Sequence, residues 1–120
     1  MIGGEQVNFA RRLPRAEAIA RLNDELRKSG CGGTIMVTRG VREHPDFDAA
    51  ALLMSLVEYD KFDADNDPHG ERDFGDLELA GTILLWKIDY YDRQLRYGSP
   101  DPADPRVTTR VLTVMLESEY

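Results

Sequence analysis

The sequence predicts an α+β domain in two layers, with helices packed against a small antiparallel sheet. Two observations predict this fold: apolar residues recur at helical spacing over 14–29, and two strand-like segments, 73–79 and 82–91, flank a tight turn. With 120 residues, 42% of them apolar and 31% charged, the chain can form one domain with a hydrophobic core. The expected element order is α-β-α-β-β-α, with a loose N-terminal segment over 1–12.

The first half of the chain predicts two helices and one strand. The first helix, over 14–29, begins with Pro14, whose missing N–H matters least at the first helical position, and Gly30 follows as a left-handed cap. Its apolar face consists of Ala18, Ile19, Leu22 and Leu26. A segment rich in β-branched residues predicts a strand over about 33–39. A second helix is expected to begin at His44-Pro45-Asp46 and to end near Tyr59.

The second half predicts a hairpin and a third helix. With Ala80-Gly81 as the turn, Leu79 faces Thr82 and Gly75 faces Trp86, where the glycine leaves room for the indole. The side chains expected to face the core from the second strand are Leu84, Trp86, Ile88 and Tyr90. Asp104-Pro105 predicts a helix start, so we expect a helix over 105–118, although VTTRVLTV also favours a strand.

Negative charge is concentrated in the segment 58–78, which we call the acidic segment. It holds nine acidic and two basic residues, so its net charge of −7 equals that of the whole chain, and the other 99 residues carry 13 of each sign. This balance disfavours direct nucleic-acid binding and docking on anionic membranes, and it favours a basic protein surface. The residues expected to bind such a partner are Asp60, Asp63, Asp65, Asp67, Glu71, Asp73, Asp89, Tyr91 and Asp92.

The leading interpretation is therefore a non-enzymatic interaction protein without catalytic residues, metal or cofactor. The alternative is a small metal-dependent or acid/base enzyme that uses His69 and nearby carboxylates together with Asp89 and Tyr91. The stretch 65–76 resembles a calcium loop in outline, but His69 occupies a ligand position that histidine fills poorly. The single cysteine, Cys31, excludes an internal disulfide, and we expect a cytoplasmic location. The sequence does not indicate the oligomeric state.

Several blocks of the sequence resemble a family of small bacterial proteins known as a domain of unknown function. They are MVTRGV at 36–41, NDPHGERDFG at 66–75, WKIDYYDRQLRYGSPDPADP at 86–105 and VTTRVLTVMLESEY at 107–120. The resemblance implies an alphaproteobacterial protein encoded on plasmids and other mobile elements, beside genes of the antirestriction type. It further implies an accessory protein that inhibits a host defence, and it assigns no catalytic residue.

Overall fold

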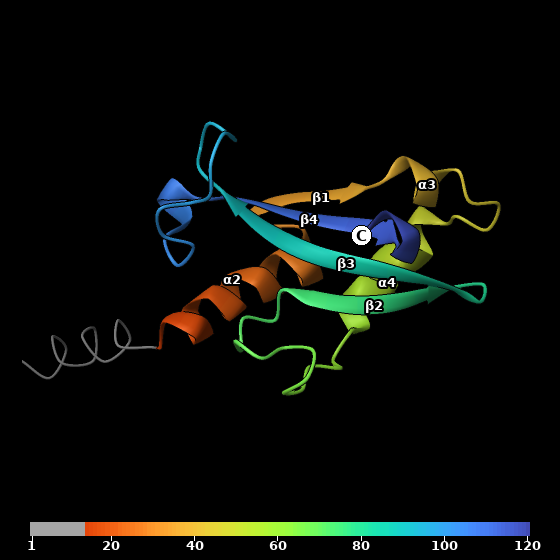
Figure 1. Ribbon diagram of the computed structural model, residues 1–120, viewed down its shortest axis with the longest axis horizontal. Helices are drawn as coiled ribbons and strands as arrows, with labels where there is room; N and C mark the ends of the chain where they lie inside the picture. Colours follow the sequence, from red (N-terminus) through yellow and green to blue (C-terminus); the bar gives the residue numbers. More distant parts are fainter. Residues whose placement is uncertain (1–13) are drawn as a thin grey trace, which may run out of the picture.

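A four-stranded mixed sheet forms the centre of the computed structural model, which describes residues 14–120 (Figure 1). The strand order is β1-β4-β3-β2, from β1 (Gly33–Val37) through β4 (Thr109–Leu116) and β3 (Thr82–Tyr91) to β2 (Phe74–Leu79). The helices are α2 (Arg15–Ser29), α3 (Arg39–Arg42) and α4 (Ala49–Glu58). The α+β class is confirmed, while the loose segment expected over 1–12 lies outside the described residues.

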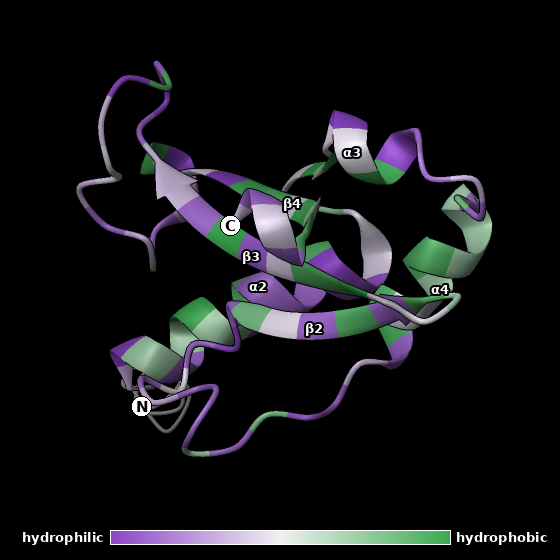
Figure 2. Ribbon diagram, turned by 45° about the vertical axis from the view of Figure 1, so that its right-hand side comes forward, coloured by the Kyte–Doolittle hydropathy of each residue, from purple (hydrophilic) through white to green (hydrophobic). Residues whose placement is uncertain are grey.

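One face of the sheet forms the core together with α2 and α4. The three strand residues Leu84, Trp86 and Ile88 are at most 4% exposed, as expected from their alternation. They pack in one cluster with Leu26 of α2 and Leu56 of α4. Figure 2 shows the hydrophobic stretch of α4 in green. The cluster also contains Leu112 and Val114 of β4. The opposite face of the sheet carries the alternate residues of each strand.

The hairpin register is confirmed in full. Leu79 pairs with Thr82, Leu77 with Leu84 and Gly75 with Trp86. Ala80 and Gly81 form the turn with φ angles of 46° and 87°, which matches a two-residue hairpin turn with positive φ at both central positions. Gly75 leaves the space that the Trp86 indole and the Tyr59 ring occupy, since a Cβ at residue 75 would lie 2.6 Å from the indole nitrogen.

The helix expected over 105–118 is wrong, because most of this segment is strand β4. Asp104 does cap a helical start, accepting a hydrogen bond from the Arg106 N–H at 2.9 Å, but the helix is a single 3₁₀ turn over Pro105–Val107. From Thr109 on, burial alternates with a period of two residues. β4 lies in the middle of the sheet, parallel to β1 and antiparallel to β3. The sheet is therefore mixed instead of antiparallel, and the chain ends in a strand and a short 3₁₀ turn, Glu117–Glu119.

Two boundaries in the first half also differ from expectation. The strand expected over 33–39 ends at Val37, because the Thr38 hydroxyl caps the short helix α3 by accepting a hydrogen bond from the Val41 N–H. The second helix begins at Ala49 instead of His44, because the Asp48 side chain, not that of Asp46, accepts the hydrogen bond from the third residue beyond it. No helix within residues 14–120 is long and apolar enough to cross a membrane.

Candidate interaction surface

The loop between α4 and β2, which carries most of the acidic segment, is held in shape by its own acidic side chains. Asp63 Oδ1 accepts hydrogen bonds from the Asp65 and Asn66 N–H groups at 2.9 and 3.0 Å. Asp67 Oδ1 accepts one from the Arg72 N–H at 3.0 Å. Side-chain carboxylates that bond nearby N–H groups stabilise turns. Asp63 and Asp67, both expected to bind a partner, therefore shape the loop.

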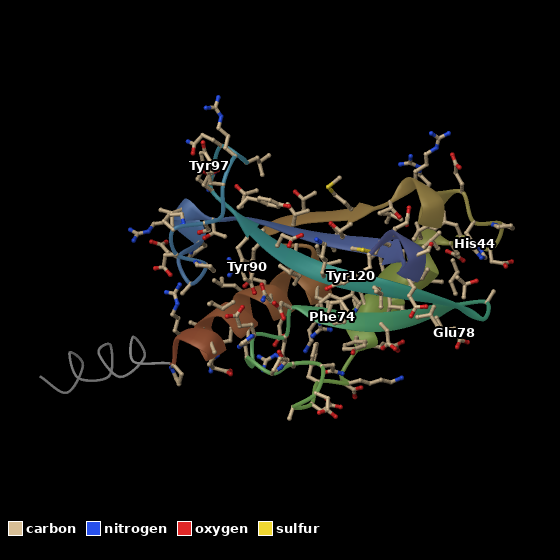
Figure 3. The ribbon with its side chains drawn as sticks, viewed as in Figure 1. His44, Phe74, Glu78, Tyr90, Tyr97 and Tyr120 are labelled. Carbon is tan, nitrogen blue, oxygen red and sulfur yellow. The ribbon has the colours of Figure 1, made fainter. Side chains whose placement is uncertain are left out.

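A buried polar chain fixes the end of this loop to α2 and the sheet. The Tyr90 hydroxyl donates to Glu71 Oε1 at 2.8 Å. Asn23 Nδ2 donates to the Tyr90 oxygen at 2.8 Å and to the Glu71 carbonyl at 2.9 Å, while Arg110 Nε donates to Asn23 Oδ1 at 2.8 Å. Burial raises the pKa of Tyr90 well above its ordinary value, so the phenol stays protonated and donates. Glu71 is thus turned inward; Figure 3 shows Tyr90 between the sheet and α2.

Two arginines attach α4 and the loop to the C-terminal half of α2. Arg72 holds the Asp24 carboxylate through Nε and Nη2, at 3.0 and 2.8 Å. Arg27, only 3% exposed, also reaches Asp24 and donates to the carbonyls of Leu56 and Tyr59 at 2.7 and 3.0 Å. These carbonyls lie at the end of α4, where helical partners are missing. The loop between α4 and β2 is therefore anchored near both of its ends.

Four exposed carboxylates surround one shallow groove along the outer edge of β2. Asp76 and Glu78 come from β2, while Glu58 and Asp60 come from the end of α4 and the residues after it. The groove has a volume of about 240 Å³ and is also lined by Ser55, Tyr59, Lys61 and Leu77. Lys61 is the one cationic side chain among these lining residues. We call this feature the acidic groove; of its four carboxylates, only Asp60 belongs to the expected partner-binding set.

Asp89 and Tyr91 lie on the sheet face opposite α2 and α4, away from the buried polar chain at Tyr90. Alternation along β3 places them beside Lys87, whose Nζ is 3.0 Å from Asp89 Oδ2. This hydrogen bond is the main cause of the raised pKa of Lys87. The residues line a hollow of about 520 Å³ together with Thr38, Thr113, Met115, Glu119 and Tyr120. Figure 3 shows Tyr120 beside Phe74, with ring centroids 5.8 Å apart.

The remaining expected site residues are dispersed. Asp92 caps a turn by accepting hydrogen bonds from the N–H groups of Gln94 and Arg96 at 3.2 and 3.0 Å. Asp65 is exposed on the loop, and His69 is exposed and does not line the hollow with Asp89 and Tyr91. Within residues 14–120, no three histidine, cysteine or acidic side chains are grouped so that they could hold a metal ion. The structure thus brings Asp60 together with Glu58, Asp76 and Glu78, keeps Asp89 and Tyr91 together in a separate hollow, and does not gather the expected residues into one site.

Asp73 gives a test of the electrostatics inside the acidic segment. Partial burial raises the pKa of its carboxyl above the ordinary value, and the nearby carboxylates of Glu71 and Asp67 raise it further. A raised pKa in the folded state means that ionised Asp73 destabilises the fold, and that this penalty disappears as the pH falls through the folded pKa. We therefore expect Asp73→Asn to be more stable than the wild type at pH 7 and to lose this advantage towards pH 4.

Urea denaturation of wild type and variant at pH 7 and pH 4 measures this difference. Asp65→Asn, in the same loop but exposed, is the control and should change the free energy of unfolding little at either pH. An Asp73→Asn variant that is less stable than the wild type at pH 7 would contradict the assignment, because it would mean that the ionised carboxylate stabilises the fold.

Comparison with protein families identifies a match over most of the domain. The family model described as a protein of unknown function (DUF3768) matches residues 37–119, from the end of β1 to the 3₁₀ turn after β4. No curated protein and no solved structure matches the chain significantly. The matched range contains α4, the whole acidic segment and three of the four strands. The chain therefore belongs to this family of proteins of unknown function.

Proposed function

We propose that this chain is a non-enzymatic interaction protein that binds a basic surface of a partner protein through its acidic groove. The observation that carries the proposal is the grouping of four exposed carboxylates, from two elements distant in sequence, around one groove. Because the loop behind the groove is held by internal hydrogen bonds, little ordering would be needed on binding. Opposite charges of this kind speed association, and added salt weakens it.

We further propose that the partner belongs to a nucleic-acid-handling complex, such as one that acts in host defence. Proteins that bind nucleic acids neutralise phosphates with lysine and arginine, so they carry the basic surfaces that the acidic groove would fit. The mobile-element context implied by the family resemblance agrees with such a role. In this proposal the groove occupies the partner's basic surface and thereby inhibits it. The chain's own net charge of −7 makes direct nucleic-acid binding the weaker proposal.

A second candidate, an acid/base enzyme, is supported by the hollow that contains Lys87, Asp89 and Tyr91. These are groups that can transfer protons, and they share one face of β3. Because His69 does not line this hollow, such an enzyme would work without it. The ion pair between Lys87 and Asp89 favours the charged amine, so Lys87 is poorly suited to act as a base. This candidate is therefore secondary to the binding role.

Affinity capture from an extract of the encoding organism tests the binding role. The acidic-groove variant carries Glu58→Gln, Asp60→Asn, Asp76→Asn and Glu78→Gln. Its matched control loses the same four negative charges at exposed sites elsewhere, through Glu25→Gln, Glu43→Gln, Asp46→Asn and Glu117→Gln. We expect wild type and control to retain the same basic protein, and the acidic-groove variant to retain it about tenfold less. Equal retention of the partner by the acidic-groove variant and the control variant would contradict the proposal, because it would show that the position of the four charges does not matter.

A further inference from the structure

The two edges of the sheet differ in how they are protected. At the β2 edge, Asp76 and Glu78 are exposed, and Tyr59 packs against Gly75. The β1 edge consists of Gly33-Thr-Ile-Met-Val, which has no charge and no proline. Natural sheets protect free edges with charges, prolines or covering segments, since an unprotected edge pairs readily with another strand. Within residues 14–120, no strand lies beyond β1.

The backbone of β1 offers bonding groups to a further strand. The Thr38 N–H donates to the Val114 carbonyl at 3.0 Å, so the even-numbered residues of β1 bond to β4. Because neighbouring residues of a strand direct their N–H and C=O groups to opposite sides, those of Ile35 and Val37 point to the free edge. A second β1 strand running antiparallel would place Ile35 opposite Ile35, with two hydrogen bonds between them, and Thr34 opposite Met36.

Apolar side chains flank this edge. A groove of about 480 Å³ between β1, α4 and the end of α2 is lined mainly by apolar residues: Ile35, Val37, Ala49, Leu52, Leu53, Leu56 and Val57. Leu53 and Met54 of α4 are 47% and 55% exposed, and Met36 on the other face of β1 is 52% exposed. Figure 2 shows the hydrophobic character of α4 along most of its length. A molecule paired with β1 would cover this apolar surface.

Charge indicates what that molecule is. The acidic segment, with the whole net charge of −7, includes the β2 edge, at the other end of the sheet from β1. The charged residues that line the groove beside β1 are Arg27 and Lys28. Arg27 is buried and donates to the Leu56 and Tyr59 carbonyls, so Lys28 is the one exposed charge of this lining, which gives little reason for a strongly charged partner. Two copies joined at β1 would form one continuous sheet and keep their acidic edges at its two ends, far apart, whereas copies joined at β2 would repel each other.

We propose that the protein forms a two-fold symmetric homodimer in which two β1 strands pair in antiparallel orientation about Ile35. Such an interface is isologous, because each copy contributes the same edge and the same groove. It leaves both acidic grooves accessible, so the dimer would present two binding sites for the partner of the proposed function. The inference does not depend on that function, since the two features lie at opposite edges of the sheet.

Sedimentation equilibrium of the full chain tests the dimer. We expect the wild type to have the mass of a dimer at about 100 μM, a concentration well above the dissociation constant of a stable interface. In the Thr34→Lys/Met36→Lys variant, the lysine at position 34 of each copy would lie opposite the lysine at position 36 of the other copy. Repulsion between these like charges should raise the dissociation constant of the dimer about 30-fold or more. Both positions are exposed in the single copy, so the fold should be retained.

Matched variants separate the edge from the rest of the surface. Leu53 and Ile83 are each 47% exposed, but only Leu53 lines the groove beside β1. Leu53→Lys should therefore weaken the dimer, and Ile83→Lys should leave it unchanged. A wild type that stays monomeric up to 100 μM would overturn the proposal, even if a different molecule were found to cover the β1 edge. So would a Thr34→Lys/Met36→Lys variant that dimerises as tightly as the wild type.

A charge-swap experiment tests the register of the pairing. Thr34→Glu/Met36→Glu should be monomeric for the same reason as the lysine variant, but a mixture of the two should form a heterodimer. In that heterodimer, each lysine would face a glutamate across the axis, because Thr34 of one copy lies opposite Met36 of the other. Two variants that remain monomeric when mixed would overturn the register about Ile35.

Discussion

Replacing Asn23 with alanine is expected to lower the free energy of unfolding by about 3 kcal/mol, which corresponds to a drop in Tm of about 10 °C. Asn23 is fully buried and makes three hydrogen bonds, to the Glu71 carbonyl, the Tyr90 hydroxyl and the Arg110 guanidinium. Alanine would leave these buried groups with fewer partners, and Arg110, which is 2% exposed, would lose its contact with α2. A buried charge that loses a partner is strongly destabilising.

Urea denaturation measures this loss, with Arg21→Ala as the control. Arg21 is exposed on the same helix, and its ion pair with Glu17 is also exposed, so its removal should change the free energy of unfolding by less than about 0.5 kcal/mol. The variants Asn23→Leu and Arg110→Met are also made singly and together. The loss of unfolding free energy in the double variant should be smaller than the sum of the two single losses, by more than about 1 kcal/mol. Additive effects would contradict the coupling between Asn23 and Arg110.

Gly75→Ala is expected to destabilise the domain by about 2–3 kcal/mol, through crowding instead of a lost contact. A Cβ at this position would lie 2.5 Å from Tyr59 Cζ and 2.6 Å from Trp86 Nε1. The two rings pack edge to face with centroids 5.3 Å apart, and Trp86 is fully buried, so neither ring can move aside freely. Because Tyr59 also lines the acidic groove, the same substitution should alter the binding surface.

Gly98→Ala is the matched control for this crowding. Its Cβ would meet no atom closer than the Tyr90 carbonyl oxygen at 3.9 Å, an ordinary contact. We expect its Tm to stay within about 2 °C of the wild type, while that of Gly75→Ala falls by about 8 °C. Equal Tm values for the two variants would mean that Tyr59 and Trp86 can make room, and the close packing at Gly75 would then not constrain the fold.

The hairpin could be predicted from the sequence because the information is local. Alternation along 82–91, the positive-φ turn and the need for space beside Trp86 all lie within 18 residues of one another and indicate the same register. In β4 two local signals disagree, since Asp104-Pro105 favours a helix start while the following β-branched residues favour a strand. The segment forms strand β4 because it pairs with β1 and β3, both of which are distant in sequence.

The same distinction applies to the candidate surface. The sequence predicts where acidic residues are concentrated, but not which carboxylates face solvent. Glu71 turns inward because Tyr90 and Asn23, 19 and 48 residues away, bind it. Asp76 and Glu78 join Glu58 and Asp60 because β2 returns beside the end of α4. The sequence does carry one signal for the buried polar chain: Asn23 is a polar residue on the apolar face of the first helix, between Ile19 and Leu26.

Zero-length carbodiimide cross-linking of the captured complex tests the acidic groove most directly. This reagent joins a carboxylate to a lysine amine only where the two are in contact, and mass spectrometry then identifies the joined residues. We expect the partner's lysines to be linked to the carboxylates that surround the groove: Glu58, Asp60, Asp76 and Glu78. Cross-links confined to carboxylates elsewhere, such as Glu25, Glu43 or Glu117, would contradict the account.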